Sequence, residues 1–320
     1  MAKYVLKRVL LLFPTLICLM LVIFSLMRMV PGSPVYALLL DEMDESEITP
    51  EAIEAKEEEM GFNRPLIVQF TEYATGILTG DWGISWYNMQ PVFENMVAVW
   101  EPTIFMGIYS GIITIVLAIP LGIFCATHRN SVLDYIISAG NTVMAVVPSF
   151  CAGLLLIYVF GWKLKWFPVT SYKSIEDVGF WKAFWYVTLP SFSMGLHGIA
   201  GMARHTRSQM LDVLSSDYIR TARAKGLSRT KVYYKHALKN TMAIVGPMVA
   251  ATIVGALGGA SVTEKVFNIR GMGTLAVSSL TRRDYNQEQA IAMFFALVSL
   301  CFDLGVDIML KVLDPRIEYE

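Results

Sequence analysis

The sequence has few charged residues and few cysteines. Only 17% of its 320 residues are charged, 55% are hydrophobic, and the mean hydropathy is +0.50. Soluble domains carry about 25% charged residues, so this composition excludes an ordinary soluble globular protein. The four cysteines all lie in apolar runs without metal-ligand spacing: Cys18, Cys125, Cys151 and Cys301. We therefore expect unpaired core residues rather than disulfides or a zinc site.

Motifs of several catalytic classes are also absent. The sequence has no GxxxxGK[ST] loop, so it does not bind ATP by that device, and it has neither HExxH nor GxSxG. Its four histidines are scattered, and only His197 falls well inside an apolar run. Because no second ligand is near in sequence, a hydrogen-bonded structural histidine is favoured over a metal ligand. We predict no catalytic residue, no metal site and no cofactor in this chain, which is therefore not expected to be an enzyme.

Long apolar runs dominate what is present. A membrane-spanning helix needs about 20 apolar residues, and six runs qualify: 9–30, 103–127, 136–160, 185–202, 241–262 and 290–310. The fourth is the weakest, because it is short and contains Pro190 and His197. A signal peptide is the alternative for the first run, but no small-residue cleavage site precedes Pro31. Arg28 near its far end is expected to extend to the membrane interface. The sequence predicts an all-α protein with six transmembrane helices.

The charge distribution predicts the orientation. With six spans and the N-terminus inside, 15 lysines and arginines lie in inside segments, nine of them between Arg204 and Lys239. Ten lie in the longer outside segments, so the positive-inside rule places both termini in the cytoplasm. The predicted divisions are residues 1–31 for the first helix, 32–100 for an extracytoplasmic segment, 101–312 for the membrane core and 313–320 for a cytoplasmic tail. The loop 204–240 then lies inside.

The segment 32–100 is acidic and partly aromatic. Thirteen Asp and Glu residues lie between Asp41 and Glu94. Thr49 as a cap, Pro50 in the first turn and Gly61 as a stop predict a charged, solvated helix. After the turn at Gly80, three residues are candidates for contact with a partner: Asp81, Trp82 and Trp86.

The polar stretch from Ser215 to Asn240 predicts two short helices in succession. Ser215 or Ser216 is the expected N-cap of the first, Gly226 the left-handed residue that ends it, and Ser228 the N-cap of the second. The first helix is too short to be stable alone, so we expect it to dock on a surface. The face expected to make that contact carries Tyr218, Ile219 and Ala222. The alternative is a plain basic cytoplasmic loop.

The same stretch carries a family resemblance. DYIRTARAKGLS followed by HALKN resembles the cytoplasmic loop of ABC importer permeases of the dipeptide, oligopeptide and nickel group. Of the wider importer pattern, Glu-Ala-Ala-x3-Gly-x9-Ile-x-Leu-Pro, only Ala222, Gly226 and Leu238 match, whereas RTARAKG is similar to the peptide and nickel branch. Segments from Lys7-Arg8, through GDWGIS and EKVF, to LDPR resemble the same group in the same order.

The resemblance implies a type I ABC importer permease in a bacterial or archaeal plasma membrane. It implies a second homologous permease subunit, two ABC ATPase subunits that bind ATP and magnesium, an extracytoplasmic substrate-binding protein and a lipid bilayer as partners, and no nucleic acid. Asp81, Trp82 and Trp86 would face the binding protein. The ATPase-coupling residues would be Tyr218, Ile219, Arg220, Thr221, Ala222, Arg223, Ala224, Lys225, Gly226 and Leu227. ATP binding would close the ATPases, move the docked loop and switch the spans from inward- to outward-facing.

Alternatives from other classes remain open. Asp303 and Asp307, one turn apart in the last span, would suit an ion-driven secondary transporter, although the larger helix count and symmetric halves common in such folds are absent. A membrane-embedded enzyme has no recognisable catalytic constellation here. For an importer, di- or oligopeptides are favoured as the substrate, and nickel or another chelated metal is the alternative. Two glycine pairs, Gly107 with Gly111 and Gly255 with Gly259, predict close helix contacts.

Overall fold

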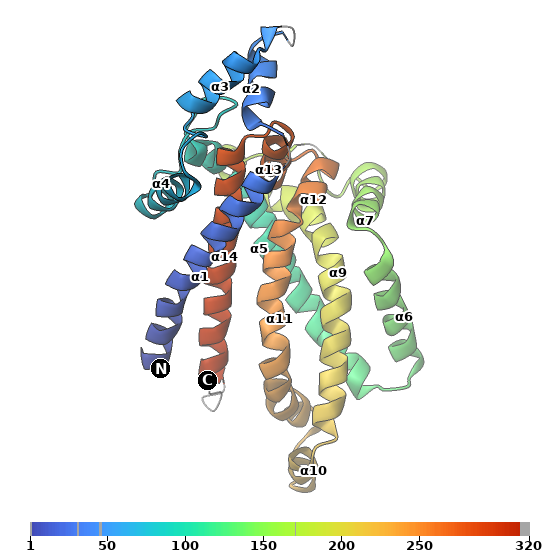
Figure 1. The fold of residues 1–320 in the computed structure, drawn as a ribbon. Coiled ribbons are helices and arrows are strands. Elements are labelled where there is room, and N and C mark those ends of the chain that lie inside the picture. Colours follow the sequence, from blue (N-terminus) through green and yellow to red (C-terminus); the bar gives the residue numbers. More distant parts are fainter. Residues whose placement is uncertain (1, 31, 45–46, 170, 314–320) are drawn as a thin grey trace. The chain divides into compact units, whose positions relative to one another are not determined.

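The computed structural model describes residues 2–30, 32–44, 47–169 and 171–313, and these are mostly helical (Figure 1). Within them the one β-type contact is an isolated bridge between Ile84 and Pro91. The chain divides into two compact units, which are described separately. The first comprises residues 2–101 with 271–300, and the second comprises 102–270 with the residues from 301 onward. The sequence had assigned 271–300 to the membrane core. Residues 314–320 of the predicted tail lie outside the described part.

The first unit holds α1 (Ala2–Met29), α2 (Pro34–Glu42), α3 (Pro50–Glu59), α4 (Leu66–Thr79) and α13 (Met272–Thr281), with parts of α5 (Val92–Thr127) and α14 (Tyr285–Leu313). The predicted charged helix is α3. Thr49 Oγ1 accepts a hydrogen bond from Ala52 N at 3.2 Å, Pro50 is its first residue, and Gly61 follows it with φ +76°. The cap, the proline and the glycine therefore set its bounds as the sequence predicts.

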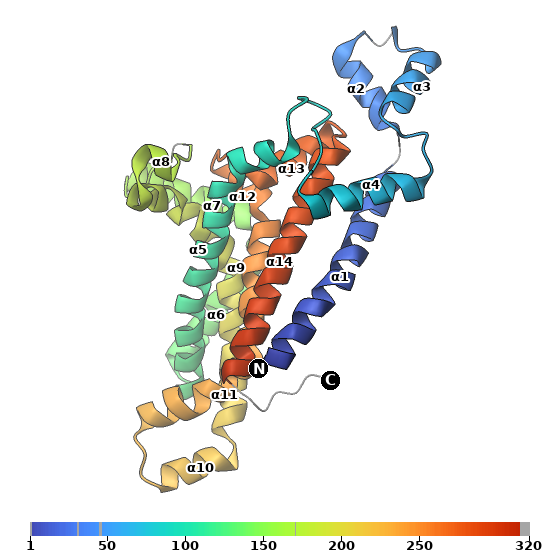
Figure 2. The same ribbon diagram turned by 90° about the vertical axis from the view of Figure 1, so that its left-hand side faces the viewer.

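Helix α4 runs across α1 rather than along it (Figure 2). Its outer side exposes Leu66, Ile67 and Leu78, while Gln69 is buried on the other side. Exposed apolar side chains of this kind suit contact with a membrane or with a partner protein. Arg28 of α1 meets the side that carries Gln69, since its Nη2 donates a hydrogen bond to Gln69 Oε1. Gln69 and two aromatic rings hold the Arg28 guanidinium against α4, and its predicted extension to the membrane interface stays a prediction.

The core of the first unit lies among α5, α13 and α14. Its buried residues are Val92, Met96, Met272, Ala290 and Ile291, and Trp82 packs against them. The loop between α4 and α5 is thus tied to the start of α14, which is distant in sequence.

The second unit is arranged around α9. It contains α6 (Val132–Val146), α7 (Ser149–Leu156), the π-helical η2 (Ile157–Lys163), α8 (Ile175–Val178), α9 (Phe180–Leu214), α10 (Asp217–Ala224), the π-helical η3 (Lys231–Ala237), α11 (Leu238–Gly258) and α12 (Ala260–Val266). Helix α9 contacts α6, α7, α11 and α12. The four cysteines are unpaired, as predicted, but Cys18 and Cys301 are exposed, so the expected core position was wrong for these two.

Three described helices are long and apolar enough to cross a membrane: Leu6–Met29, Val92–Thr127 and Tyr285–Met309. Two bent pairs also qualify, 132–146 with 149–163 and 231–242 with 244–258, with bends of 107° and 62°. The predicted span 136–160 is therefore broken into two helices rather than continuous. Pro148 lacks an N–H and disfavours a helical residue before it, so α6 ends and α7 begins there. The predicted span 185–202 lies inside α9, whose 35 residues are not apolar enough to qualify.

The two glycine pairs differ in how closely other helices of this chain approach them. A Cβ on Gly107 would lie 2.3 Å from Leu257 Cδ2, and one on Gly111 would lie 2.3 Å from Ile253 Cγ1. These glycines allow α5 and α11 to approach closely, as predicted. A Cβ on Gly255 would meet no described atom within 4 Å, so that part of α11 is open within this chain.

Candidate functional site

Helix α10 and the turn after it form the predicted polar loop. Ser216 occupies the N-cap position of α10, but its Oγ donates to Val213 O at 2.6 Å, so the predicted side-chain cap does not form. Gly226 has φ +77° and follows the helix, which confirms its predicted left-handed conformation. Ser228 Oγ accepts from Lys231 N at 3.5 Å at the start of the second helix, as predicted.

The inner face of α10 is buried in this chain itself. Ile219 has no exposed surface and Ala222 is 8% exposed. Both pack on a set of residues from α5, α9 and η3 that we call the α10 cluster: Ile123, Ala126, Met210, Val232 and Ala237. Ile219 and Ala222 therefore dock on their own chain, and their predicted role in ATPase coupling stays a prediction. The pattern correctly indicated a docked helix, but the surface it docks on comes from the same chain.

Tyr218 lies at the edge of this contact, where its hydroxyl accepts from Asn240 Nδ2 at 2.6 Å. Leu227 is half-buried and packs against the α10 cluster. The remaining predicted coupling residues are exposed, and with Asp217 they form what we call the outer face of α10: Asp217, Arg220, Thr221, Arg223, Ala224 and Lys225. This face has three cations and one carboxylate, of which Arg220 and Asp217 lie 3.3 Å apart. This face is accessible to a second protein.

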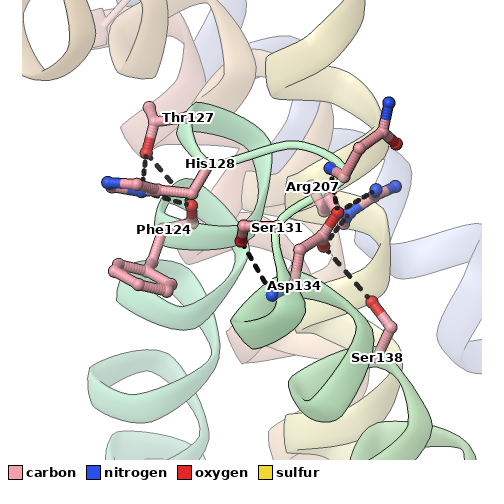
Figure 3. A network of polar contacts seen from close by, with 8 residues as sticks. Phe124, Thr127, His128, Ser131, Asp134, Ser138 and Arg207 are labelled. Atoms are coloured by element: carbon pink, nitrogen blue, oxygen red, sulfur yellow. Dashed lines mark hydrogen bonds and ion pairs between the residues drawn. The ribbon is translucent and has the colours of Figure 1, made fainter.

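An ion pair beside α10 was missed from the sequence. Figure 3 shows Asp134 of α6 with Arg207 of α9: Arg207 Nε donates to Oδ1 at 2.8 Å and Nη2 to Oδ2 at 2.7 Å. Asn130 N and Ser138 Oγ also donate to this carboxylate, at 3.0 and 3.4 Å. The spacing of Ser131 and Asp134 is a helix-start signal that could have placed Asp134, but nothing in the sequence links it to Arg207.

The three predicted external contact residues differ in their exposure. Asp81 is exposed and accepts a hydrogen bond from Gly83 N at 3.1 Å. Trp82 and Trp86 are half-buried inside the first unit. Trp82 packs on Phe93, and Trp86 packs on Phe62 and Tyr285 with ring centroids 5.2 and 5.9 Å away. The aromatic turn therefore has a packing role, and of the three residues Asp81 is the exposed one.

Asp284 holds the loop that follows this turn. Ser85 Oγ donates to its Oδ2 at 2.5 Å and Trp86 N to its Oδ1 at 3.2 Å. The loop exposes Tyr87 and Met89, and the Arg282 guanidinium lies 3.5 Å from the centroid of the Tyr87 ring. These two exposed residues form the tip of residues 84–90; the sequence favoured the aromatic stretch from Trp82 to Tyr87 as a partner contact, but not Met89.

His197 differs from the prediction. It is exposed on α9 and forms no hydrogen bond with the described part of the chain. It lines a pocket of about 240 Å³ with Ser149, Thr252 and Thr263 among others. The structural, hydrogen-bonded role expected for it was therefore wrong. Among the residues described there is no group of three His, Cys, Asp or Glu side chains suited to a metal ion.

Comparisons with known proteins were made on the sequence and on the fold. The family described as "Binding-protein-dependent transport system inner membrane component" matches residues 118–319, and its N-terminal companion matches residues 1–105. The chain is 36% identical to the glutathione transport system permease proteins GsiC of Escherichia coli (strain K12) and Salmonella typhi, over 320 residues and 100% of both chains. The fold is similar to an inward-facing structure of the MetNI methionine ABC transporter, with a TM-score of 0.56, 14% identity, and coverage of 70% of this chain and 98% of that one.

Proposed function

Because this chain belongs to the binding-protein-dependent transport system inner membrane component family, it is a permease of an ABC importer, and we propose that it carries short peptides about the size of glutathione. The observation that carries the proposal is the 36% identity with glutathione permeases over the full length of both chains. This substrate class overlaps the di- and oligopeptides favoured from the sequence only for short peptides.

The His197 pocket supports a peptide substrate. An ionisable side chain exposed within a predicted span is costly against lipid, so it is expected to face protein or a water-filled path. Imidazole and the hydroxyls of Ser149 and Thr252 can bind the carboxylate and amides of a peptide. The pocket is therefore our candidate for part of the translocation pathway.

A second permease subunit would complete that pathway. Gly255 lines the same pocket. A Cβ added at Gly255, Gly201 or Gly258 would have no described atom within 4 Å. Small residues on an open face allow a second helix to approach closely. We propose that this face of α9 and α11 contacts the partner permease.

The outer face of α10 is our candidate contact for the ATPase subunits, which supply ATP and magnesium. The buried inner face connects α10 to the ends of α5, α9 and η3 through the α10 cluster. A displacement of α10 by the ATPase would therefore move these helix ends directly, with no flexible segment between. Asp81 and the tip with Tyr87 and Met89 are our candidate contacts for the binding protein.

An uptake assay tests the substrate. The full transporter would be reconstituted in proteoliposomes with its binding protein. It should accumulate labelled glutathione or a labelled dipeptide when ATP is present. An excess of unlabelled peptide should reduce this uptake by competition. Nickel and its chelates are the matched competitors. Uptake of nickel without peptide uptake would overturn the peptide proposal. Uptake driven by an ion gradient without ATP would support the secondary-transport alternative.

Cysteine labelling tests the orientation. In a cysteine-free chain, Glu57→Cys and Ser228→Cys each place a thiol at a position outside the candidate spans. Impermeant reagent added to intact cells should label the first and not the second, which should react only after the membrane is opened. Labelling of both from outside would reject the placement of α10 in the cytoplasm.

A further inference from the structure

A second polar pocket lies within the first unit, at the C-terminal end of α1. Its volume is about 280 Å³, and residues of α1, α4, the loop before α5 and the start of α14 line it. It is separate from the His197 pocket, which is built in the other unit. No motif in the sequence indicated it, because its polar residues come from four segments.

Hydrogen-bond donors around this pocket lack acceptors. Arg28 uses Nη2 on Gln69, but its Nε and Nη1 have no partner in the described structure. The hydroxyl of Tyr73 and Nε2 of Gln289 are likewise buried without a partner. Gln289 is only 4% exposed. Because buried polar groups in proteins are almost always hydrogen-bonded, several unused donors lining one pocket indicate a missing acceptor.

The missing acceptor should carry a negative charge. No described carboxylate forms an ion pair with Arg28, although its guanidinium is partly buried. Glu72 lines the pocket, but it is exposed and pairs with Arg64 at 2.7 Å. A buried cation without a counter-ion is unfavourable, and charge-assisted hydrogen bonds to a phosphate or carboxylate would relieve this.

The donors are held in place before any ligand arrives. The Arg28 guanidinium carbon lies 4.9 Å from the ring centroids of both Phe24 and Phe62. Tyr73 stacks on Phe24 with centroids 6.1 Å apart, and burial raises the pKa of Tyr73 to about 12, so its hydroxyl stays a neutral donor. Two aromatic rings in contact with a cation restrict its motion and reduce the entropy lost when an anion binds.

The surroundings indicate where the anion comes from. Beside the pocket residues Phe24 and Arg28, α1 exposes Leu26 and Met29, and α4 exposes Leu66 and Ile67 on its outer side. Leu26 and Met29 lie on a candidate membrane span, and the exposed apolar side chains of α4 suit contact with lipid. We propose that this pocket binds the phosphodiester head group of a membrane lipid, with Arg28, Tyr73 and Gln289 donating to the phosphate oxygens. The acyl chains would lie along the exposed leucines and isoleucine of α1 and α4.

Lipid binding by the intact transporter tests this. The delipidated complex would be titrated with phosphatidylglycerol. Binding would be measured as the shift in Tm of the complex and as bound lipid in native mass spectrometry. Diacylglycerol, which lacks the phosphate, and soluble glycerophosphoglycerol, which lacks the chains, are the comparison probes. We expect a Tm increase with phosphatidylglycerol only. A full shift with the soluble head group, or an equal shift with diacylglycerol, would overturn the proposal.

Variants assign the effect to this pocket. Arg28→Gln should abolish the lipid-dependent shift, and Arg64→Gln, which removes an exposed arginine nearby, is the matched control and should keep it. Because Arg28→Gln can also impair folding, Tyr73→Phe and Gln289→Met each remove one donor at nearly constant shape. One lost hydrogen bond to a charged group predicts roughly tenfold weaker lipid binding for each. If Tyr73→Phe and Gln289→Met both keep the wild-type lipid affinity, the assignment to this pocket is refuted.

Discussion

The Arg207 guanidinium donates two hydrogen bonds, of 2.8 and 2.7 Å, to the carboxylate of Asp134. This bidentate ion pair joins α9 to α6 (Figure 3). The Asp134 side chain is 3% exposed and that of Arg207 is 29% exposed. Arg207 lies one turn before Met210, which belongs to the α10 cluster. The ends of α6 and α9 are therefore fixed to each other beside the helix that we propose contacts the ATPase.

Asp134→Asn should destabilise the permease. Removing one partner of a buried pair leaves the other uncompensated, and because Arg207 is partly exposed we expect a loss of about 2–3 kcal/mol rather than more. The Tm of the purified complex measures this, and the double variant with Arg207→Met should lose less than the sum of the two single variants. The control is Asp217→Asn at the exposed Arg220 pair, which should cost no more than about 0.5 kcal/mol. Strict additivity at Asp134 and Arg207 would contradict a coupled pair.

The two faces of α10 should respond differently to charge. Ala222→Glu places a carboxylate among the apolar residues of the α10 cluster, so it should loosen the loop even without ATPase subunits. Limited trypsin digestion of the permease alone should then cut at Arg220, Arg223 and Lys225 faster than in the wild type. Arg223→Glu on the outer face should leave digestion elsewhere unchanged and weaken ATPase binding. Normal protease resistance in Ala222→Glu would show that the inner face is not closely packed.

A substitution at Gly226 tests the effect of backbone strain alone, because an added side chain would not clash with neighbouring atoms. Its φ is +77°, and a Cβ there would meet nothing within 4 Å. Gly226→Val should therefore cost about 1–2 kcal/mol through the left-handed conformation alone. Gly226→Asn should cost less, because asparagine tolerates this conformation better. ATPase coupling, measured as binding-protein-stimulated hydrolysis by the full complex, should fall in the same order. Equal effects of valine and asparagine would exclude backbone strain as the cause.

The sequence predicted local features better than their partners. The caps and stop of α3, the left-handed Gly226 and the unpaired cysteines follow from single residues and their neighbours, and all are confirmed. The inner face of α10 was correctly identified as a contact surface, but periodicity cannot tell whether the partner is the same chain.

Longer-range relationships had no sequence signal. Asp134 with Arg207 and Asp284 with Ser85 are separated by 73 and 199 residues. Their pairing depends on how helices pack, which single-sequence patterns do not contain. The break at Pro148 was underestimated because a proline inside an apolar run is compatible with a kinked span as well as with two helices.

The two glycine pairs separate packing within the chain from packing against a partner. A Cβ at Gly111 would lie 2.3 Å from Ile253, which is buried, so Gly111→Val must displace α11 and should cost about 1–3 kcal/mol. Gly255→Val meets no described atom within 4 Å, so the isolated permease should keep its wild-type Tm. If the open face of α11 contacts the second permease, as we propose, the valine at 255 should instead reduce the amount of paired permease recovered by cross-linking or native mass spectrometry. Gly140→Val, which is also unhindered but lies on α6, is the matched control and should change neither property. Normal pairing in Gly255→Val would place the subunit contact on another face, because a close helix approach at a glycine does not accommodate a branched side chain.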